Sequence, residues 1–234
     1  MVSLPIAGIC SMATRTLLAE LAPAYEQRAG QPVTLTSVGG IEALRRVQSG
    51  EPFDFVALAS DAIGRLASEG HVDPASRVDL ARSGVAVAVK QGAPQPDLAT
   101  GEAVRQAVLA ARKVGYSTGP SGVYLVRLFE RWGIAETIAA RIVQAPPGVP
   151  VGTLVASGEV ELGFQQLSEL VGLPGIDIVG PLPSDVQVIT VFSAARCSVS
   201  TRPAEVAAWF AFLTRSEADD AKRRYGLEPA GERP

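Results

Sequence analysis

Short apolar segments that run directly into a small-residue turn, and then into a helix-like segment, recur along this chain of 234 residues. The pattern is clearest at residues 114–133, where Val-Gly-Tyr is followed by Ser-Thr-Gly-Pro-Ser-Gly and then by apolar residues at helical spacing. Parallel strands need crossover connections, so alternating strands and helices favour a largely parallel sheet with helices on both faces. The sequence therefore predicts an α/β fold. A late apolar run over residues 186–192 predicts one further strand.

Small-residue turns stand at several predicted junctions between a strand and the following helix. They lie at Ser11, Gly39–Gly40, Ser60, Ser117–Gly122 and Gly148. Ligands of parallel sheets bind beyond the carboxyl ends of the strands, and the free amides at a helix N-terminus favour an anion. We therefore expect these turns to converge on one anion-binding cleft.

Composition excludes several classes of function. The net charge of −3 and the pI near 5.3 give no basic footprint for nucleic acid, and no apolar run approaches the ~18 residues of a membrane span. The two cysteines, Cys10 and Cys197, lie in apolar segments and are predicted to be buried free thiols, with a bridge between them as the alternative. Neither nucleic-acid binding nor membrane insertion is expected.

Common catalytic motifs are missing. The chain has neither G-x-G-x-x-G nor G-x-x-x-x-G-K-[ST], and its one histidine, His71, is predicted to lie in a surface loop. A histidine-based triad and a two-histidine metal site are therefore excluded. We expect no cofactor and no metal, and the sequence assigns no catalytic residue.

The groups that remain can hydrogen-bond an anion, and nearly all of them are uncharged. They are the hydroxyls of Ser11, Thr14, Ser117, Thr118 and Ser121, the backbone amides of Gly39, Gly40, Gly122 and Val149, and the side-chain amides of Gln165 and Gln166. Arg15 is the main candidate cation and would pair with a carboxylate if its side chain points inward. The alternative for Arg15 is a solvated side chain on the first turn of a helix.

Segments spread over nearly the whole chain resemble the type-2 periplasmic solute-binding proteins, in the branch of the molybdate-binding proteins. These segments are the Ser11 turn and residues 44–60, 83–89, 116–134, 154–164 and 222–229. The resemblance implies two α/β lobes joined by crossing strands, with an anion in the cleft between them. It implies a first lobe of residues 1–83 with 191–234 and a second lobe of residues 84–190.

The resemblance also implies particular site residues. Ser11 matches the first oxyanion-binding serine, Ser121 falls near a residue whose amide binds the anion, and Val149 approximates the next amide donor. The chain departs from molybdate binders at Gly39–Gly40, where they have a serine-rich turn, and at Gln166, where they have a tyrosine. Glycines enlarge the space and Gln166 adds an amide, which suits an organic carboxylate better than molybdate or tungstate.

Three hypotheses of function follow. The first is a non-catalytic receptor for a small anion, with the membrane component of an ABC transporter as its implied partner. The second is an isomerase, because the aconitate isomerases also resemble this branch; Arg15, Gln165 and Gln166 would then hold carboxylates, and Tyr116, Tyr124 or a serine would move an allylic proton. The third is a ligand-sensing module of the cytoplasm.

The location of the protein stays open at this point. A receptor whose signal peptide was removed would be periplasmic. A chain that begins natively as written would be cytoplasmic, because residues 1–8 lack the basic start and long apolar region of a secretory signal.

Overall fold

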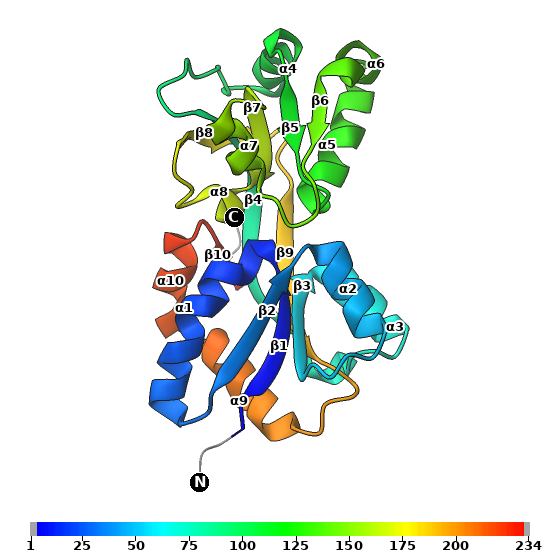
Figure 1. Cartoon of the computed structure of the whole chain (residues 1–234), viewed down its shortest axis with the longest axis vertical. Helices are drawn as coiled ribbons and strands as arrows, with labels where there is room; N and C mark the ends of the chain where they lie inside the picture. Colours follow the sequence, from blue (N-terminus) through cyan, green and yellow to red (C-terminus); the bar gives the residue numbers. More distant parts are fainter. Residues whose placement is uncertain (1–3, 232–234) are drawn as a thin grey trace. The chain divides into compact units, whose positions relative to one another are not determined.

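The computed structural model describes residues 4–231, and the chain divides into two compact units (Figure 1). Unit 1 comprises the residues up to Arg82 together with those from Val191 onward, and unit 2 comprises Ser83–Thr190. The chain passes from one unit into the other within two strands, β4 (Val78–Lys90) and β9 (Ile189–Arg196). Each unit has its own buried apolar clusters.

Unit 1 begins with three strand-helix pairs and ends with two helices and a short strand. Its elements are β1 (Ile6–Ser11), α1 (Met12–Ala29), β2 (Val33–Val38), α2 (Gly40–Gln48), β3 (Phe55–Ala59), α3 (Ser60–Ser68), η1 (Pro74–Ser76), α9 (Pro203–Leu213), η3 (Ser216–Ala218), α10 (Asp219–Arg224) and β10 (Glu228–Pro229), with parts of β4 and β9. Helix α1 ends at Gly30, whose φ of 67° is the left-handed conformation that favours glycine at a helix C-terminus.

The strands of unit 1 form a mixed sheet. β1 pairs in parallel with β2 and with β3, and β9 pairs antiparallel with β3 on its other side. β10 pairs antiparallel with β4, with Pro229 opposite Ala81 and Glu228 opposite Arg82. All five residues of β3 are buried, as expected for a strand covered on both faces.

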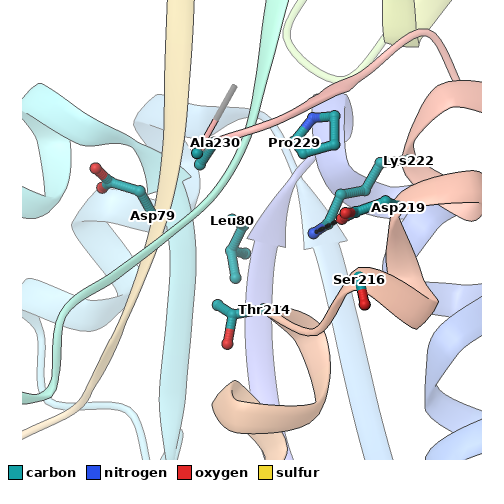
Figure 2. Close-up of a pocket in the computed structure, with 9 residues that line it drawn as sticks. Asp79, Leu80, Thr214, Ser216, Asp219, Lys222, Pro229 and Ala230 are labelled. Atoms are coloured by element: carbon teal, nitrogen blue, oxygen red, sulfur yellow. Dashed lines mark hydrogen bonds and ion pairs between the residues drawn. The ribbon is translucent and has the colours of Figure 1, made fainter. Parts of the chain in front are cut away.

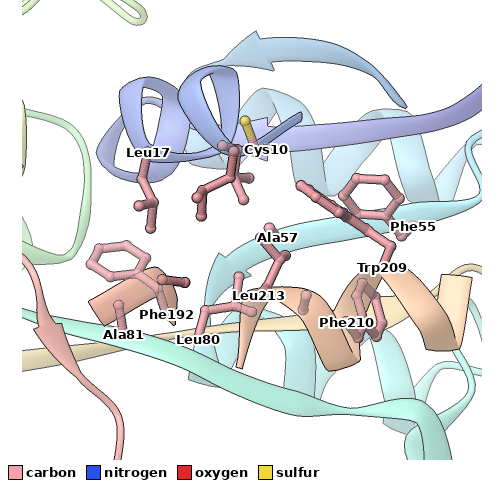
Figure 3. Close-up of a cluster of buried hydrophobic side chains, with 14 of the residues drawn as sticks. Cys10, Leu17, Phe55, Ala57, Leu80, Ala81, Phe192, Trp209, Phe210 and Leu213 are labelled. Atoms are coloured by element: carbon pink, nitrogen blue, oxygen red, sulfur yellow. The ribbon is translucent and has the colours of Figure 1, made fainter. Parts of the chain in front are cut away.

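Aromatic side chains form the centre of the larger core cluster of unit 1 (Figure 3). Trp209 of α9 is wholly buried, and its ring lies 5.1 Å from that of Tyr25 in α1. Phe210 meets Phe55 of β3 edge to face, with ring centroids 5.8 Å apart. The carboxyl-terminal part of the chain therefore completes the core that the first strands begin.

Unit 2 repeats the alternation of strands and helices. Its elements are α4 (Gly101–Ala110), β5 (Val114–Tyr116), α5 (Pro120–Arg131), α6 (Ala135–Ile138), η2 (Ala139–Arg141), β6 (Ile142–Gln144), α7 (Val151–Ser157), β7 (Leu162–Gln166), α8 (Leu167–Leu170) and β8 (Ile176–Pro181), with parts of β4 and β9. β5 pairs in parallel with β6 and β7, whereas β4 pairs antiparallel with β7 and β8. Phe129 of α5 packs on this sheet against Phe164, with ring centroids 6.4 Å apart.

Two details of the sheets correct the sequence expectations. The sheet of each unit is mixed rather than largely parallel, because the strands that cross between the units and the short β8 and β10 run antiparallel to their neighbours. The strand predicted over residues 186–192 begins only at Ile189. Val186 closes a turn on Pro183 (N–O 3.0 Å), and the side chain of Gln187 bonds the backbone of Val85 and Leu182 instead of joining a strand.

Both cysteines are buried free thiols, as predicted. Burial and the nearby Asp54 carboxylate raise the pKa of Cys197 to about 12, so its reactive thiolate is scarce at neutral pH. Among the helices that the structure describes, none combines the length and the hydropathy of a membrane-spanning segment.

The turn between β5 and α5 depends on a close approach of backbone to backbone. A Cβ atom placed on Gly122 would lie only 1.7 Å from the carbonyl oxygen of Ser117. Gly122 lies in the first turn of α5, so only a residue without a Cβ lets the helix start directly over that carbonyl group.

Gly122→Ala should therefore destabilise the protein, because the Ser117 carbonyl or the start of α5 must move. We expect the free energy of unfolding to fall by at least ~1–3 kcal/mol, measured by urea denaturation. Gly64→Ala is the matched control: it lies inside α3 with no atom within 4 Å of the new Cβ, and should gain about 0.5–1 kcal/mol from the higher helix propensity of alanine. Equal stability of Gly122→Ala and the wild type would contradict the close approach.

Candidate functional site

The turn from Ser117 to Ser121 in unit 2 gathers hydroxyl groups and free amides. The hydroxyl of Ser117 accepts a hydrogen bond from the amide of Gly119 (3.2 Å) and lies 3.3 Å from the hydroxyl of Ser121. Ser121 is wholly buried and Thr118 half-buried. Pro120 starts the 12-residue helix α5, whose first amides have no partner within the helix and carry the positive end of its dipole. This turn can hydrogen-bond an anion.

Unit 1 places Ser11 beside the Gly39–Gly40 turn. Ser11 ends β1 and precedes α1, yet its hydroxyl makes no capping bond. That hydroxyl oxygen is buried and has no hydrogen-bond partner among the described residues. A buried hydroxyl without a protein partner is unusual in a native protein, and such a group can bond a ligand or a water molecule.

The glycine at position 40 is not required by the backbone. Neither Gly39, with φ of −59°, nor Gly40 has a positive φ. A Cβ on Gly40 would find the Cβ of Ser11 at 4.0 Å, an ordinary contact, and no other atom closer. The backbone would accept a larger residue at position 40. The space beside Ser11, at the start of the nine-residue helix α2, is therefore open because glycine has no side chain.

Arg15 lies on the first turn of α1, and its side chain is exposed. Thr14, by contrast, is wholly buried, and its hydroxyl donates to the carbonyl oxygen of Ser11 at 3.4 Å. No ion pair holds Arg15 among residues 4–231, so its guanidinium is available to a ligand. Its role as a carboxylate partner stays a prediction.

Gln165 and Gln166 end β7 and are both buried, but they make different contacts. The side chain of Gln165 accepts from the amide of Val151 at the start of α7 (2.8 Å) and donates to Glu169 (2.9 Å). The side chain of Gln166 donates to the hydroxyl of Thr190 (2.7 Å), and its Oε1 has no partner among the described residues. Gln165 is thus committed to the fold, whereas Gln166 keeps an acceptor free.

Val149 lies in a tight turn rather than at an open helix start. Its amide donates to the carbonyl oxygen of Pro146 at 3.0 Å, and Gly148 between them has a φ of 79°. The donor that the sequence assigned to a ligand is therefore used by the turn in this structure. A ligand contact at Val149 stays a prediction.

Two charged residues of interest carry no sequence signal. Arg82, the last residue of unit 1 before the chain enters unit 2, has a buried Nε without a partner among residues 4–231. Glu169 lies against Gln165 in unit 2. An isolated arginine in a strand and a glutamate in a short helix match no motif. Only the structure distinguishes them, Arg82 by its buried Nε and Glu169 by its bond to Gln165.

A cavity of about 410 Å³ lies elsewhere, within unit 1 beside α10 and β10 (Figure 2). Lys222 lines it, 97% buried as a side chain, and its ammonium group bonds Asp219 at 2.8 Å. The lining also includes Asp79, whose carboxylate is bonded to Ser193 and Arg77. The ammonium group of Lys222 is already paired with Asp219, so the described residues of the lining offer no unpaired cation to an anion. None of the sequence-predicted site residues lines this cavity.

No group of three or more histidine, cysteine, aspartate or glutamate side chains within the described part of the chain is arranged to hold a metal ion. Apart from Arg15, the candidate groups that the sequence predicts in both units are hydroxyls and amides, which carry no net charge. Such a set recognises an anion by hydrogen bonds that are already in place.

Comparison with known proteins shows the relationships of the chain. The sequence model of a family described as bacterial extracellular solute-binding protein matches residues 6–228. An aconitate isomerase from Pseudomonas sp. is 40% identical over 221 residues, which cover 92% of this chain and 84% of that protein.

Solved structures confirm the predicted fold. The periplasmic molybdate-binding protein of Azotobacter vinelandii superposes with a TM-score of 0.78 at 20% identity, over 95% of this chain and 98% of that one. The binding protein AgtB of A. tumefaciens R10, in complex with agropinic acid, gives a TM-score of 0.73 at 13% identity, over 98% and 83% of the two chains. At such identities the likeness shows the fold alone, which is the two-lobed type-2 periplasmic-binding-protein fold.

Removing the hydroxyl of Ser11 should cost the unliganded protein almost nothing, because that oxygen makes no hydrogen bond. We expect Ser11→Ala to stay within about 0.5 kcal/mol of the wild-type unfolding free energy, or above it. Ser193→Ala is the contrasting control: its wholly buried hydroxyl donates to Asp79 at 2.6 Å, so its loss should cost ~1–3 kcal/mol. Urea denaturation of both variants measures this, and a large loss in Ser11→Ala would show a structural role instead.

Proposed function

The chain belongs to the bacterial extracellular solute-binding protein family, and from that premise we propose that it binds a small organic polycarboxylate. The observation that carries the proposal is the buried, unpaired hydroxyl of Ser11 beside the open space at Gly40. A hydroxyl of this kind is satisfied by a ligand oxygen, and the extra space suits a ligand larger than a bare oxyanion. In unit 2, the Ser117–Ser121 turn and Gln166 supply further uncharged groups to the proposed ligand.

Charge also supports a carboxylate ligand. Arg15 is exposed without an ion pair among the described residues, and Arg82 keeps a buried Nε without a partner. Guanidinium groups pair bidentately with carboxylates, and each such pair supplies orientation as well as charge. A ligand with two or three carboxylates uses both cations, which a single monoanion cannot do.

A binding protein that delivers its ligand needs a membrane component to receive it. We propose such a transporter component as the partner, in line with the family to which the chain belongs. The ligand can order the two units for that partner only if its affinity differs between their arrangements.

Titration calorimetry tests the ligand class. We expect heat of binding with citrate, tricarballylate, cis-aconitate or trans-aconitate, and weaker or no binding with molybdate and sulfate. Ser11→Ala and Ser121→Ala should each weaken the affinity about 10-fold, the effect of one lost hydrogen bond to a charged group. Ser157→Ala, the same change at an exposed serine of α7, should leave it unaltered. Binding of molybdate without any polycarboxylate would overturn the proposal.

Isomerisation of aconitate is the second candidate, favoured by the relative that is 40% identical and bears that activity in its name. The reaction removes a proton from the methylene carbon, shifts the double bond, and returns a proton to the other allylic carbon. It therefore needs a group that takes up a proton.

The tyrosines are poorly placed for that task. Burial raises the pKa of Tyr116, so its hydroxyl stays protonated at neutral pH and is not available as a phenolate base. The hydroxyl of Tyr124 already donates to the carbonyl oxygen of Val186 at 2.8 Å. Glu169, held by Gln165, is the carboxylate that the structure offers in their place. Because neither tyrosine is suited to take up a proton, we rank binding above turnover.

Proton NMR of the protein with cis-aconitate decides between the two candidates. If the chain is an isomerase, trans-aconitate accumulates, and in D2O deuterium enters the allylic position. Glu169→Gln should then abolish turnover while leaving calorimetric binding measurable, and Glu159→Gln, the same change at an exposed glutamate, should not. Binding of cis-aconitate without formation of trans-aconitate would contradict the isomerase hypothesis and support the binding function.

A further inference from the structure

Gln166 holds a buried acceptor that nothing in the described part of the chain satisfies. The residue is 1% exposed, and its Nε2 donates to the hydroxyl of Thr190 at 2.7 Å. Its Oε1 is buried as well and accepts no hydrogen bond. Leaving a buried amide oxygen unpaired is costly, so a native protein keeps one chiefly where another molecule completes it.

The position of Gln166 in β7 places this acceptor at the same end of the unit 2 sheet as the Ser117–Ser121 turn. Side chains two residues apart on a strand share a face, and Phe164 packs against Phe129 of α5. Gln166 therefore projects from the face of the sheet that α5 covers. β5 runs parallel beside β7, with Tyr116 opposite Phe164, so the Ser117 turn leaves the sheet at the same end as Gln166.

The neighbouring Gln165 differs from Gln166 in the contacts of its side chain. It projects from the opposite face, where its side-chain oxygen accepts from Val151 and its nitrogen donates to Glu169. Of the two adjacent glutamines, Gln165 thus holds the start of α7, whereas the side-chain oxygen of Gln166 has no partner among the described residues. An amide oxygen can only accept a hydrogen bond, so the group that pairs with Oε1 of Gln166 must be a hydrogen-bond donor.

We propose that Gln166 is a specificity-determining residue that accepts a hydrogen bond from a hydroxyl group of the ligand. The inference rests on the proposed binding of a polycarboxylate and narrows it to hydroxy-polycarboxylates. At neutral pH the carboxylates of such a ligand are ionised and can only accept, so they suit the hydroxyls, amides and guanidinium groups of the site. Only the hydroxyl of the ligand can donate to Oε1 of Gln166.

Citrate and tricarballylate form a matched pair of probes, because they differ only in the hydroxyl group on the central carbon. Calorimetry of the full chain should give citrate an affinity at least about 10-fold higher than that of tricarballylate, since tricarballylate leaves the Gln166 oxygen unpaired. In Gln166→Leu the two affinities should become equal within about 2-fold, mainly through weaker citrate binding. Gln106→Leu, the same change at an exposed glutamine of α4, should keep the wild-type preference.

Gln166→Glu is a second variant that tests the proposal if Gln166→Leu fails to fold. It keeps an acceptor of the same shape that can still meet the hydroxyl of Thr190, so the preference for citrate should persist while the added charge weakens both ligands. Equal affinities in the wild type, or a preference that survives in folded Gln166→Leu, would overturn the role of Gln166 and leave polycarboxylate binding intact. Absence of binding by every polycarboxylate would overturn the proposed function itself, and this inference with it.

Discussion

A helix that starts directly at the carboxyl end of a parallel strand is the constraint on which both units depend. It directs unpaired amides and the positive end of the helix dipole toward the sheet edge. In unit 1 this junction is β1 to α1 at Ser11, and in unit 2 it is β5 to α5 at Ser117. The absent side chain of Gly122, which lets α5 begin over the Ser117 carbonyl, shows how closely the second junction is fitted.

Buried polar side chains in this protein differ in whether their hydrogen bonds are met. Ser193 and Gln165 are buried, and each polar atom of their side chains has a hydrogen-bond partner, so they stabilise the fold. Ser11 and Gln166 are also buried, and each keeps an oxygen without a partner among the described residues. Because a buried polar atom without a partner opposes folding, such atoms are where a ligand gains most by binding.

Particular elements show how far sequence reasoning reached. The pattern of apolar residues and small-residue turns placed α5 and the starts of α1 and α2 within a few residues, because each of these helices follows a strand and buries one face. The start of β9 was misplaced, since a turn at Pro183 and the side-chain bonds of Gln187 compete with strand pairing. Ser11, Ser117 and Ser121 were candidates from their junctions, whereas Arg82 and Glu169 were missed because neither belongs to a local pattern.

The sequence alone determined the α/β class, the strand-helix junctions and the uncharged character of the candidate groups, because periodicity and residue chemistry are local properties. Only the tertiary structure decided which of those groups are free. Gln165 and Gln166 are identical neighbours in sequence, yet the alternation of a strand sends one to α7 and the other to Thr190. The partner of each polar atom is set by segments distant in the chain, and no local pattern specifies it.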